Sequence, residues 1–370
     1  MFLALGLSLG SLSASAVPLF NVVNLVTDDQ TANPAQITDP SLVNAWGISR
    51  SGGSPFWVSS NGMGVATLYS VNPVTQATTK QGLTVTIPGA GNPTGQVFAN
   101  VAGSFNGDTF LFASEDGTIS GWRGALGTAA ETLKPGSPSN VYKGLASSTI
   151  GGTVYLYGAN FLNDTIDVLK GNAGAPNLTG TFTDPSIPTG YAPFNAQNLN
   201  NTIYVTYALR ETGGIDDDPG PGRGFVDAYD LQGNLLGRVA SMGALNSPWG
   251  LAIAPASFGG LAGDLLVGNF GDGRINIYSL GTNTFLGQLA GPNGQPIDID
   301  GLWALTTGNG GSGGSANAIY FSAGPDGESH GLFGVISSAP EPGSLSLMGL
   351  AMLGLVLGRV GFWGQRTSTP

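Results

Sequence analysis

The chain has 370 residues with 12 Lys or Arg against 23 Asp or Glu, so its formal net charge is −11 at pH 7. This acidity argues against nucleic acid as a partner, because no basic surface is available to neutralise phosphate groups. The chain has no cysteine, which excludes disulfides and thiol chemistry. The 61 glycines and 23 prolines, interleaved with β-branched and aromatic residues, predict many short strands joined by tight turns.

The N-terminal segment is typical of a secretory signal peptide. Phe2 to Leu12 is apolar apart from two serines and its glycines, and the small residues Ala14, Ser15 and Ala16 follow. Signal peptidases cleave after small-x-small sequences of this kind. We therefore expect Ala14 and Ala16 to be the recognised small residues and cleavage to follow Ala16. This removes residues 1–16 and leaves a mature chain that starts at Val17.

From residue 17 to residue 338 the sequence repeats itself. The first strand of each unit contains a small residue. We take Gly47, Gly95, Gly144, Ala196, Gly250 and Ala304 as equivalent, and they are spaced by 48, 49, 52, 54 and 54 residues. These first strands are expected at 44–49, 93–98, 142–146, 193–197, 248–253 and 301–305. Second strands are expected at 56–59, 109–113, 154–157, 203–207, 265–268 and 319–322. Third strands are expected at 64–70, 118–122, 165–169, 224–229, 274–278 and 330–335.

Short strands at this spacing, without a helical period between them, are typical of the blades of a β-propeller. We therefore predict an all-β, six-bladed β-propeller at residues 17–338. Two stacked β-sandwiches are the alternative, although they would need no such period. Glycine in the first strand would let the crowded innermost strands approach one another. The apolar segment Phe20 to Val26 precedes the repeats, and we expect it to be the outer strand of blade six, which closes the ring.

Several segments of the repeats resemble a family of uncharacterised bacterial propellers, which often carry C-terminal sorting tails. The segments are the Trp-Gly pairs at 46–47 and 249–250 together with residues 115–122, 190–194, 264–274, 300–303 and 324–333. The resemblance covers residues 20–337. It implies the propeller fold and no settled activity.

Residues 339–366 form a separate C-terminal segment. Pro340, Glu341 and Pro342 precede an apolar run, and the basic residues Arg359 and Arg366 follow that run. This order resembles the PEP-CTERM sorting signal of Gram-negative bacteria. The resemblance implies export, a transient stay in the inner membrane, cleavage by an exosortase, and release to the periplasm, cell surface or exterior.

The apolar run itself predicts a single hydrophobic helix. From Leu345 to Gly358 it would extend about 21 Å, which is too short for a hydrocarbon core of about 30 Å. A helix from Ser344 to Trp363 is long enough if Arg359 reaches the cytoplasmic interface. An ordinary C-terminal anchor that is never cleaved is the alternative reading.

Catalytic candidates are few. His330 is the only histidine, and we expect it to be a solvated turn residue rather than a general base. The insertion that contains Asp216, Asp217 and Asp218 is expected to be an exposed loop, with a surface Ca²⁺ loop as the alternative. Trp46, Trp249 and Trp303 are expected to pack between blades rather than to stack on sugars.

Oxygen-bearing side chains at or near the starts of the first strands are candidate Ca²⁺ ligands. In a propeller these positions surround one mouth of the central channel; they are Asn44, Asn92, Asn195, Asn246 and Asp300. The arrangement resembles gluconolactonase-like and paraoxonase-like propellers, which implies a Ca²⁺-dependent hydrolase of lactones or esters with a carboxylate from Asp298 or Asp300. Ordinary turn chemistry explains the same residues without a metal.

Taken together, the sorting tail, the acidic surface and the missing catalytic set favour a non-enzymatic role. We expect an exported binding or structural component of the cell surface or exopolysaccharide matrix. Its expected partners are an exosortase during processing and exopolysaccharide or surface proteins afterwards. The Ca²⁺-dependent hydrolase is the second hypothesis, and a hub for protein recognition is the third.

Overall fold

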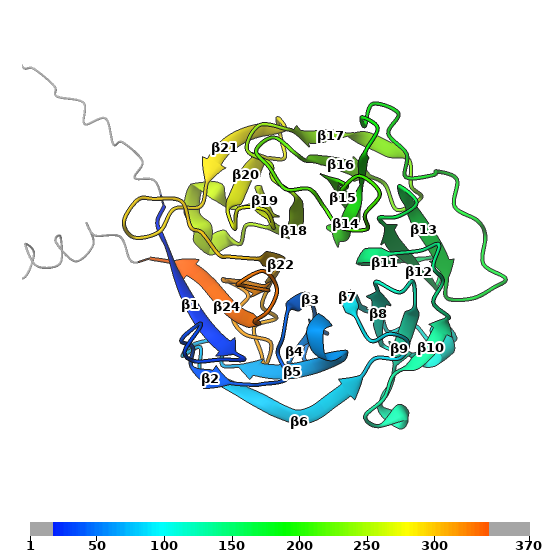
Figure 1. The fold of residues 1–370 in the computed structure, drawn as a ribbon, viewed down its shortest axis with the longest axis horizontal. Helices are drawn as coiled ribbons and strands as arrows, with labels where there is room; N and C mark the ends of the chain where they lie inside the picture. The colour runs from blue at the N-terminus through cyan, green and yellow to red at the C-terminus, as the bar shows by residue number, and fades with distance from the viewer. Residues whose placement is uncertain (1–17, 340–370) are drawn as a thin grey trace, which may run out of the picture.

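Six small sheets surround a central axis in the computed structural model, which describes residues 18–339 (Figure 1). Neighbouring strands within each sheet pair antiparallel, except for one short parallel pair formed by Val26–Thr27 and Ile37–Thr38, and the first strand of the repeat lies nearest the axis. The predicted all-β, six-bladed propeller is therefore confirmed. The signal-peptide residues Ala14 and Ala16 lie outside the described residues. So do the tail residues Pro340, Glu341, Pro342, Arg359 and Arg366, and the proposals about both ends stay predictions.

The blades follow one another along the chain. Blade one contains β3 (Ala45–Ser49), β4 (Phe56–Ser60), β5 (Val65–Val71) and β6 (Thr78–Thr86). Blade two contains β7 (Pro93–Phe98), β8 (Phe110–Ser114), β9 (Ile119–Trp122) and β10 (Glu131–Lys134). Blade three contains β11 (Tyr142–Ile150), β12 (Thr153–Asn160) and β13 (Thr165–Lys170).

The second half of the ring continues the pattern. Blade four contains β14 (Tyr191–Leu199), β15 (Thr202–Leu209), β16 (Phe225–Tyr229) and β17 (Leu235–Ser241). Blade five contains β18 (Pro248–Ile253), β19 (Leu265–Asn269), β20 (Ile275–Ser279) and β21 (Thr284–Gln288). Blade six contains β22 (Leu302–Thr307), β23 (Ile319–Ala323) and β24 (Leu332–Ser338), joined by β1 (Phe20–Thr27) and β2 (Ile37–Thr38).

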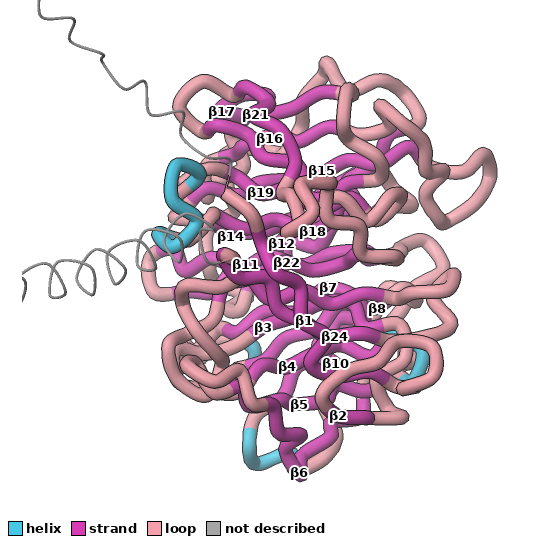
Figure 2. The backbone as a smooth tube through the Cα atoms, turned by 90° about the vertical axis from the view of Figure 1, so that its left-hand side faces the viewer, coloured by secondary structure: helices cyan, strands magenta, loops and turns pink. Residues whose placement is uncertain are grey.

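Among residues 18–339, helical structure is confined to short 3₁₀ segments, which Figure 2 shows among the loops around the strands. They are η1 (Asn61–Met63), η2 (Phe105–Gly107), η3 (Gly124–Leu126) and η4 (Ala256–Leu261). Between residues 18 and 339, none of these helices has the length and hydrophobicity needed to cross a membrane. The hydrophobic helix predicted for the C-terminal tail falls outside this range.

The N-terminal strand closes the ring. β1 pairs antiparallel with β24, with Val22 opposite Ile336, so the first described strand becomes an outer strand of blade six. Phe20 anchors this strand, because its ring is fully buried and lies 4.4 Å from the ring of Phe258 in η4. The predicted role of residues 20–26 is confirmed. This closure removes an exposed sheet edge between blade six and blade one.

Glycine is required where neighbouring innermost strands meet. A Cβ atom on Gly144 in β11 would lie 2.6 Å from the Cα atom of Asn195 in β14. A Cβ atom on Gly250 in β18 would lie 2.5 Å from the backbone oxygen of Trp303 in β22. No side chain fits at these distances, so the recurring small residue has the geometric cause expected from the sequence.

Aromatic side chains fill the region near the axis. Trp46, Trp249 and Trp303 are all almost fully buried, and the rings of Trp46 and Trp303 stack with centroids 3.7 Å apart. Trp249 packs edge-on against both of them. These residues belong to a core cluster that joins blades one, four, five and six. The prediction that they form inter-blade core is therefore confirmed.

Candidate functional site

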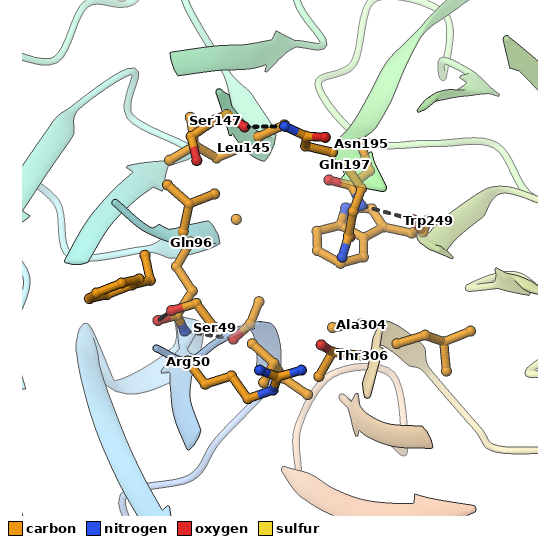
Figure 3. A pocket seen from close by; sticks show the side chains of 18 of the residues that line it. Ser49, Arg50, Gln96, Leu145, Ser147, Asn195, Gln197, Trp249, Ala304 and Thr306 are labelled. Atoms are coloured by element: carbon orange, nitrogen blue, oxygen red, sulfur yellow. Dashed lines mark hydrogen bonds between the residues drawn. The ribbon is translucent and has the colours of Figure 1, made fainter. Parts of the chain in front are cut away.

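A cavity of about 450 Å³ lies on the propeller axis, mainly between the C-terminal halves of the innermost strands. Figure 3 shows the polar side chains around its open centre, which include Ser49, Arg50, Gln96, Ser147, Gln197 and Thr306. They come from blades one, two, three, four and six. We call this space the axial cavity.

Some of the polar groups in the axial cavity hold the wall together. The Gln96 amide donates to the Gly47 backbone oxygen at 2.7 Å and accepts from the Ser49 hydroxyl at 2.9 Å, which joins blade two to blade one. By contrast, the Gln197 amide and the Ser147 hydroxyl have no hydrogen-bond partner among residues 18–339. These two groups can therefore bind a ligand without giving up an internal bond.

A tight hairpin turn extends the wall of the axial cavity at blade four. Asn200 and Asn201 connect β14 to β15 with φ values of 54° and 64°. Asparagine tolerates this left-handed region better than most residues, which explains the Asn-Asn pair at a two-residue hairpin. Asn198 donates from Nδ2 to the Ser147 backbone oxygen at 2.8 Å, so the turn is fixed against blade three.

Arg50 is the only ionisable residue among those that line the axial cavity. Its Nε atom donates to the Thr307 backbone oxygen at 2.6 Å, and its Nη2 atom donates to the Thr307 hydroxyl at 3.0 Å. Burial lowers the pKa of Arg50 from its ordinary value. The cavity therefore combines neutral hydrogen-bonding groups with one fixed positive charge.

A different charge cluster lies at the N-terminal ends of the innermost strands. The Lys143 side chain is 3% exposed, and its Nζ atom lies 2.5 Å from Glu115 and 2.6 Å from Asp216. Burial alone would lower the pKa of Lys143, but the two carboxylates outweigh it and hold the pKa above its ordinary value. Burial raises the pKa of Glu328, although the positive charge of Lys143 acts in the opposite direction.

Three of the five predicted Ca²⁺ ligands use their side chains in internal hydrogen bonds. Asn44 accepts from the Trp303 indole at 3.0 Å and donates to Glu328 at 2.5 Å. Asn195 donates to the Trp249 backbone oxygen at 2.9 Å, and it is the one member of the set that also lines the axial cavity. Asn246 accepts from the backbone of the blade-four insertion at 2.6 Å.

The other two predicted ligands lie near turns. The Asp300 carboxylate is exposed and accepts from the Asp326 backbone at 2.7 Å, and the Asn92 backbone oxygen accepts from Glu115 at 3.1 Å. Across residues 18–339, no three Asp, Glu or His side chains are grouped so that they could hold a metal ion. Asp298, the alternative carboxylate, is exposed. The Ca²⁺ site remains a prediction.

Two further expectations are corrected in part. His330 is only partly exposed, because its Nδ1 atom lies 2.9 Å from the Asp28 carboxylate, and Asp28 raises the pKa of His330. In the blade-four insertion, Asp216 is exposed as predicted. Asp217, however, is only 9% exposed, and burial raises its pKa to about 6. The reason is that part of the insertion packs against the rest of the propeller: Asp216 contacts Lys143, and Asp217 forms a β-bridge with Arg210.

The sequence reasoning missed Arg50 and Lys143, although the repeat alignment contained a signal for both. Arg50 lies three positions after Gly47, the small residue of its first strand, and the other units have Phe98, Ser147, Leu199, Ile253 and Thr307 at the equivalent position. Lys143 lies one position before Gly144, the small residue of its own unit, and the other units have Trp46, Thr94, Asn195, Trp249 and Trp303 at the equivalent position. Each is therefore the only charged residue at its position in the six units.

Comparisons with known proteins were consistent with this architecture. No protein-family model matches the chain. Among solved structures, an auxiliary nutrient binding protein from Bacteroides ovatus aligns with a TM-score of 0.51 at 10% identity, over 87% of this chain and 78% of that chain. At such low identity this likeness shows the fold alone.

Closer sequence relatives are viral. Uncharacterized protein R648 of Acanthamoeba polyphaga mimivirus is 31% identical over 333 residues, which cover 85% of this chain and 79% of that protein. Uncharacterized protein L690 of the same virus is 31% identical over 320 residues, which cover 80% of each chain. These relatives correct the expectation of a bacterial family. The chain belongs to the protein family that includes proteins R648 and L690 of this virus.

Proposed function

We propose that the propeller is a non-catalytic binding module that holds a short stretch of a glycan in the axial cavity. The observation that carries this proposal is the lining of the cavity, which is rich in amide and hydroxyl groups and contains no carboxylate or imidazole. Sugars present many hydroxyl groups, each of which can both donate and accept a hydrogen bond. The unpartnered Gln197 amide and Ser147 hydroxyl match this chemistry.

The size and chemistry of the axial cavity favour binding over hydrolysis. Its volume of about 450 Å³ falls within the range of about 300–1,000 Å³ that is usual for small-molecule sites. Hydrolysis by general acid–base chemistry needs a group that gains and loses a proton near neutral pH. Arg50 is the only ionisable group in the lining, and an arginine stays protonated.

The proposed setting is the cell surface or extracellular polysaccharide matrix. Support for this setting comes from the residues alone: the apolar segment before Ala14 and Ala16, and the tail with Pro340, Glu341 and Pro342. In this proposal an exosortase processes the tail, and the propeller then meets polysaccharide outside the inner membrane. The Ca²⁺-dependent hydrolase would instead use the opposite end of the channel.

Glycan-array screening followed by calorimetry on the purified protein tests the proposal. We expect the wild-type protein to bind at least one class of oligosaccharide, and Gln197→Ala to weaken that binding by about 3- to 10-fold, as for one lost hydrogen bond. Gln81→Ala is the matched control, because Gln81 lies on the outer strand β6. Absence of glycan binding, or equal effects of the two variants, would contradict the proposal.

A further inference from the structure

Arg50 differs from the other arginines of the propeller. Residues 18–339 contain six arginines, and four of them form ion pairs with carboxylates: Arg123, Arg210, Arg223 and Arg238. Arg274 is exposed to solvent, so water and salt screen its charge. Arg50 alone is partly buried and has no carboxylate partner within the described range.

The surroundings of Arg50 leave its charge uncompensated. Burying a cation without a counter-ion costs free energy, and proteins usually avoid that cost by pairing the charge. The remaining lining of the axial cavity is neutral, although the described residues carry more than twice as many acidic as basic side chains. The acidic groups of the channel gather instead around Lys143, at the other end of the innermost strands.

The guanidinium is also held in a fixed position. Nε and Nη2 are used in the two hydrogen bonds to Thr307, which bridge blade one and blade six. The Nη1 atom has no hydrogen-bond partner among residues 18–339. An arginine that is fixed through two of its nitrogens and free at the third is oriented for a ligand before the ligand arrives.

We propose that Arg50 is an anion-binding subsite of the axial cavity, which selects sugars that carry a carboxylate, such as uronic acids. This inference rests on the proposed glycan-binding function and adds the class of glycan. One guanidinium compensates one negative charge, which fits a carboxylate better than a phosphate with a charge of about −1.5 to −2. The neutral amides and hydroxyls of the cavity would then bind the sugar hydroxyls.

Calorimetric titration with two matched probes tests the inference. The probes are trigalacturonic acid and its fully methyl-esterified form, which share one sugar backbone and differ in charge. We expect the purified wild-type protein to bind the acid at least about 10-fold more tightly at ~50 mM salt, and this preference to shrink at ~500 mM salt as screening increases. Arg50→Gln is expected to lose the preference, and Arg50→Lys to keep part of it.

Arg274→Gln is the matched control, because it removes the same charge from an exposed site. It is expected to keep the full preference for the acid. Since Arg50→Gln also loses contacts between blades, its melting temperature is measured alongside. If that variant does not fold, the wild-type comparison of acid and ester and the Arg50→Lys variant still decide the question.

The outcomes separate this inference from the proposed function. Equal binding of acid and ester by the wild-type protein overturns the carboxylate subsite and leaves glycan binding intact. A preference for the acid that survives in Arg50→Gln also overturns the role of Arg50. Failure to bind either probe, in a protein that binds neutral glycans on the array, overturns the inference alone, whereas failure on the array as well overturns both.

Discussion

The Nζ atom of Lys143 lies 2.5 Å from Oε1 of Glu115, and this contact joins β11 of blade three to the turn after β8 of blade two. A second contact of 2.6 Å to Asp216 adds the insertion of blade four. The same ammonium lies 5.4 Å from the ring centroid of Trp46, within reach of a cation–π interaction. One buried cation therefore links three blades to the aromatic core of the channel.

Replacement of Lys143 should destabilise the propeller. We expect Lys143→Met to lower the free energy of unfolding by about 3–5 kcal/mol, because Glu115 loses its ionic partner and other carboxylates remain nearby. Urea denaturation measures this change. Lys170→Met is the control, since Lys170 bonds only to neutral oxygens, and we expect it to cost under about 1 kcal/mol. Equal costs for the two variants would show that the buried ion pairs contribute little.

The contact between innermost strands predicts a sharp difference between two glycines. Gly144→Ala should lower the free energy of unfolding by roughly 1–3 kcal/mol or more, because the new methyl group overlaps the backbone of Asn195. Gly52→Ala should be close to neutral, since no atom lies within 4 Å of the added Cβ. Thermal denaturation of both variants tests the prediction, and a stable Gly144→Ala protein would mean that blades three and four can move apart.

The buried carboxyl of Asp217 predicts a pH-dependent stability. Burial raises its folded-state pKa to about 6 from an ordinary value of 3.8. The folded state therefore binds the proton more tightly than the unfolded state, and stability falls as pH rises from about 4 to about 6. Asp217→Asn is neutral at every pH, so it should be more stable than wild type above about pH 6, by up to roughly 3 kcal/mol.

Below about pH 4 the gain from Asp217→Asn should disappear, because the wild-type carboxyl is then protonated in both states. Melting temperatures measured across this range give the comparison. Asp298→Asn serves as the control, since Asp298 is exposed, and we expect no comparable gain. A gain that is the same at low and high pH would point to a cause other than the ionisation of Asp217.

Because β1 closes the ring, truncation of the side chain of Phe20, which anchors β1, should destabilise the propeller. Phe20→Ala should lower the free energy of unfolding by about 3–5 kcal/mol, because it leaves a cavity against Phe258. Phe285→Ala, on the outer strand β21, should change stability by about 0.5 kcal/mol or less, since that ring is 48% exposed. Chemical denaturation of the two variants provides the measurement. Similar effects would indicate that β1 adds little to closure.

The fold could be predicted because each blade is built from strands that are close in sequence. Short strands, turn residues and a recurring small residue are local features, and they recur in every unit. Even the pairing of Phe20 with blade six followed from counting strands, since the last unit lacked an outer one. Blade three is the exception, because its sheet contains three strands, β11 to β13, among the described residues, whereas the other sheets contain four or five.

The site was less accessible to sequence reasoning because its parts come from different blades. Arg50 and Thr307 are bonded between the adjacent blades one and six, which are far apart in the sequence, and no pattern within one unit predicts that contact. The candidate metal ligands show the second difficulty. Spacing placed Asn44 near the channel, but only the structure reveals that its side-chain amide is already hydrogen-bonded to Trp303 and Glu328. Side-chain direction depends on such partners and not on the repeat.

The pairing of β1 with β24 also has a consequence for biosynthesis. The ribosome makes β1 before any blade and β24 after all the others, so the ring stays open until the chain is almost complete. Contacts between such distant segments form slowly, because the chain must first lose the entropy of a very large loop. The edge of β1 that pairs with β24 therefore stays unpaired until β24 is made, and the domain reaches its final shape only after translation of the last blade.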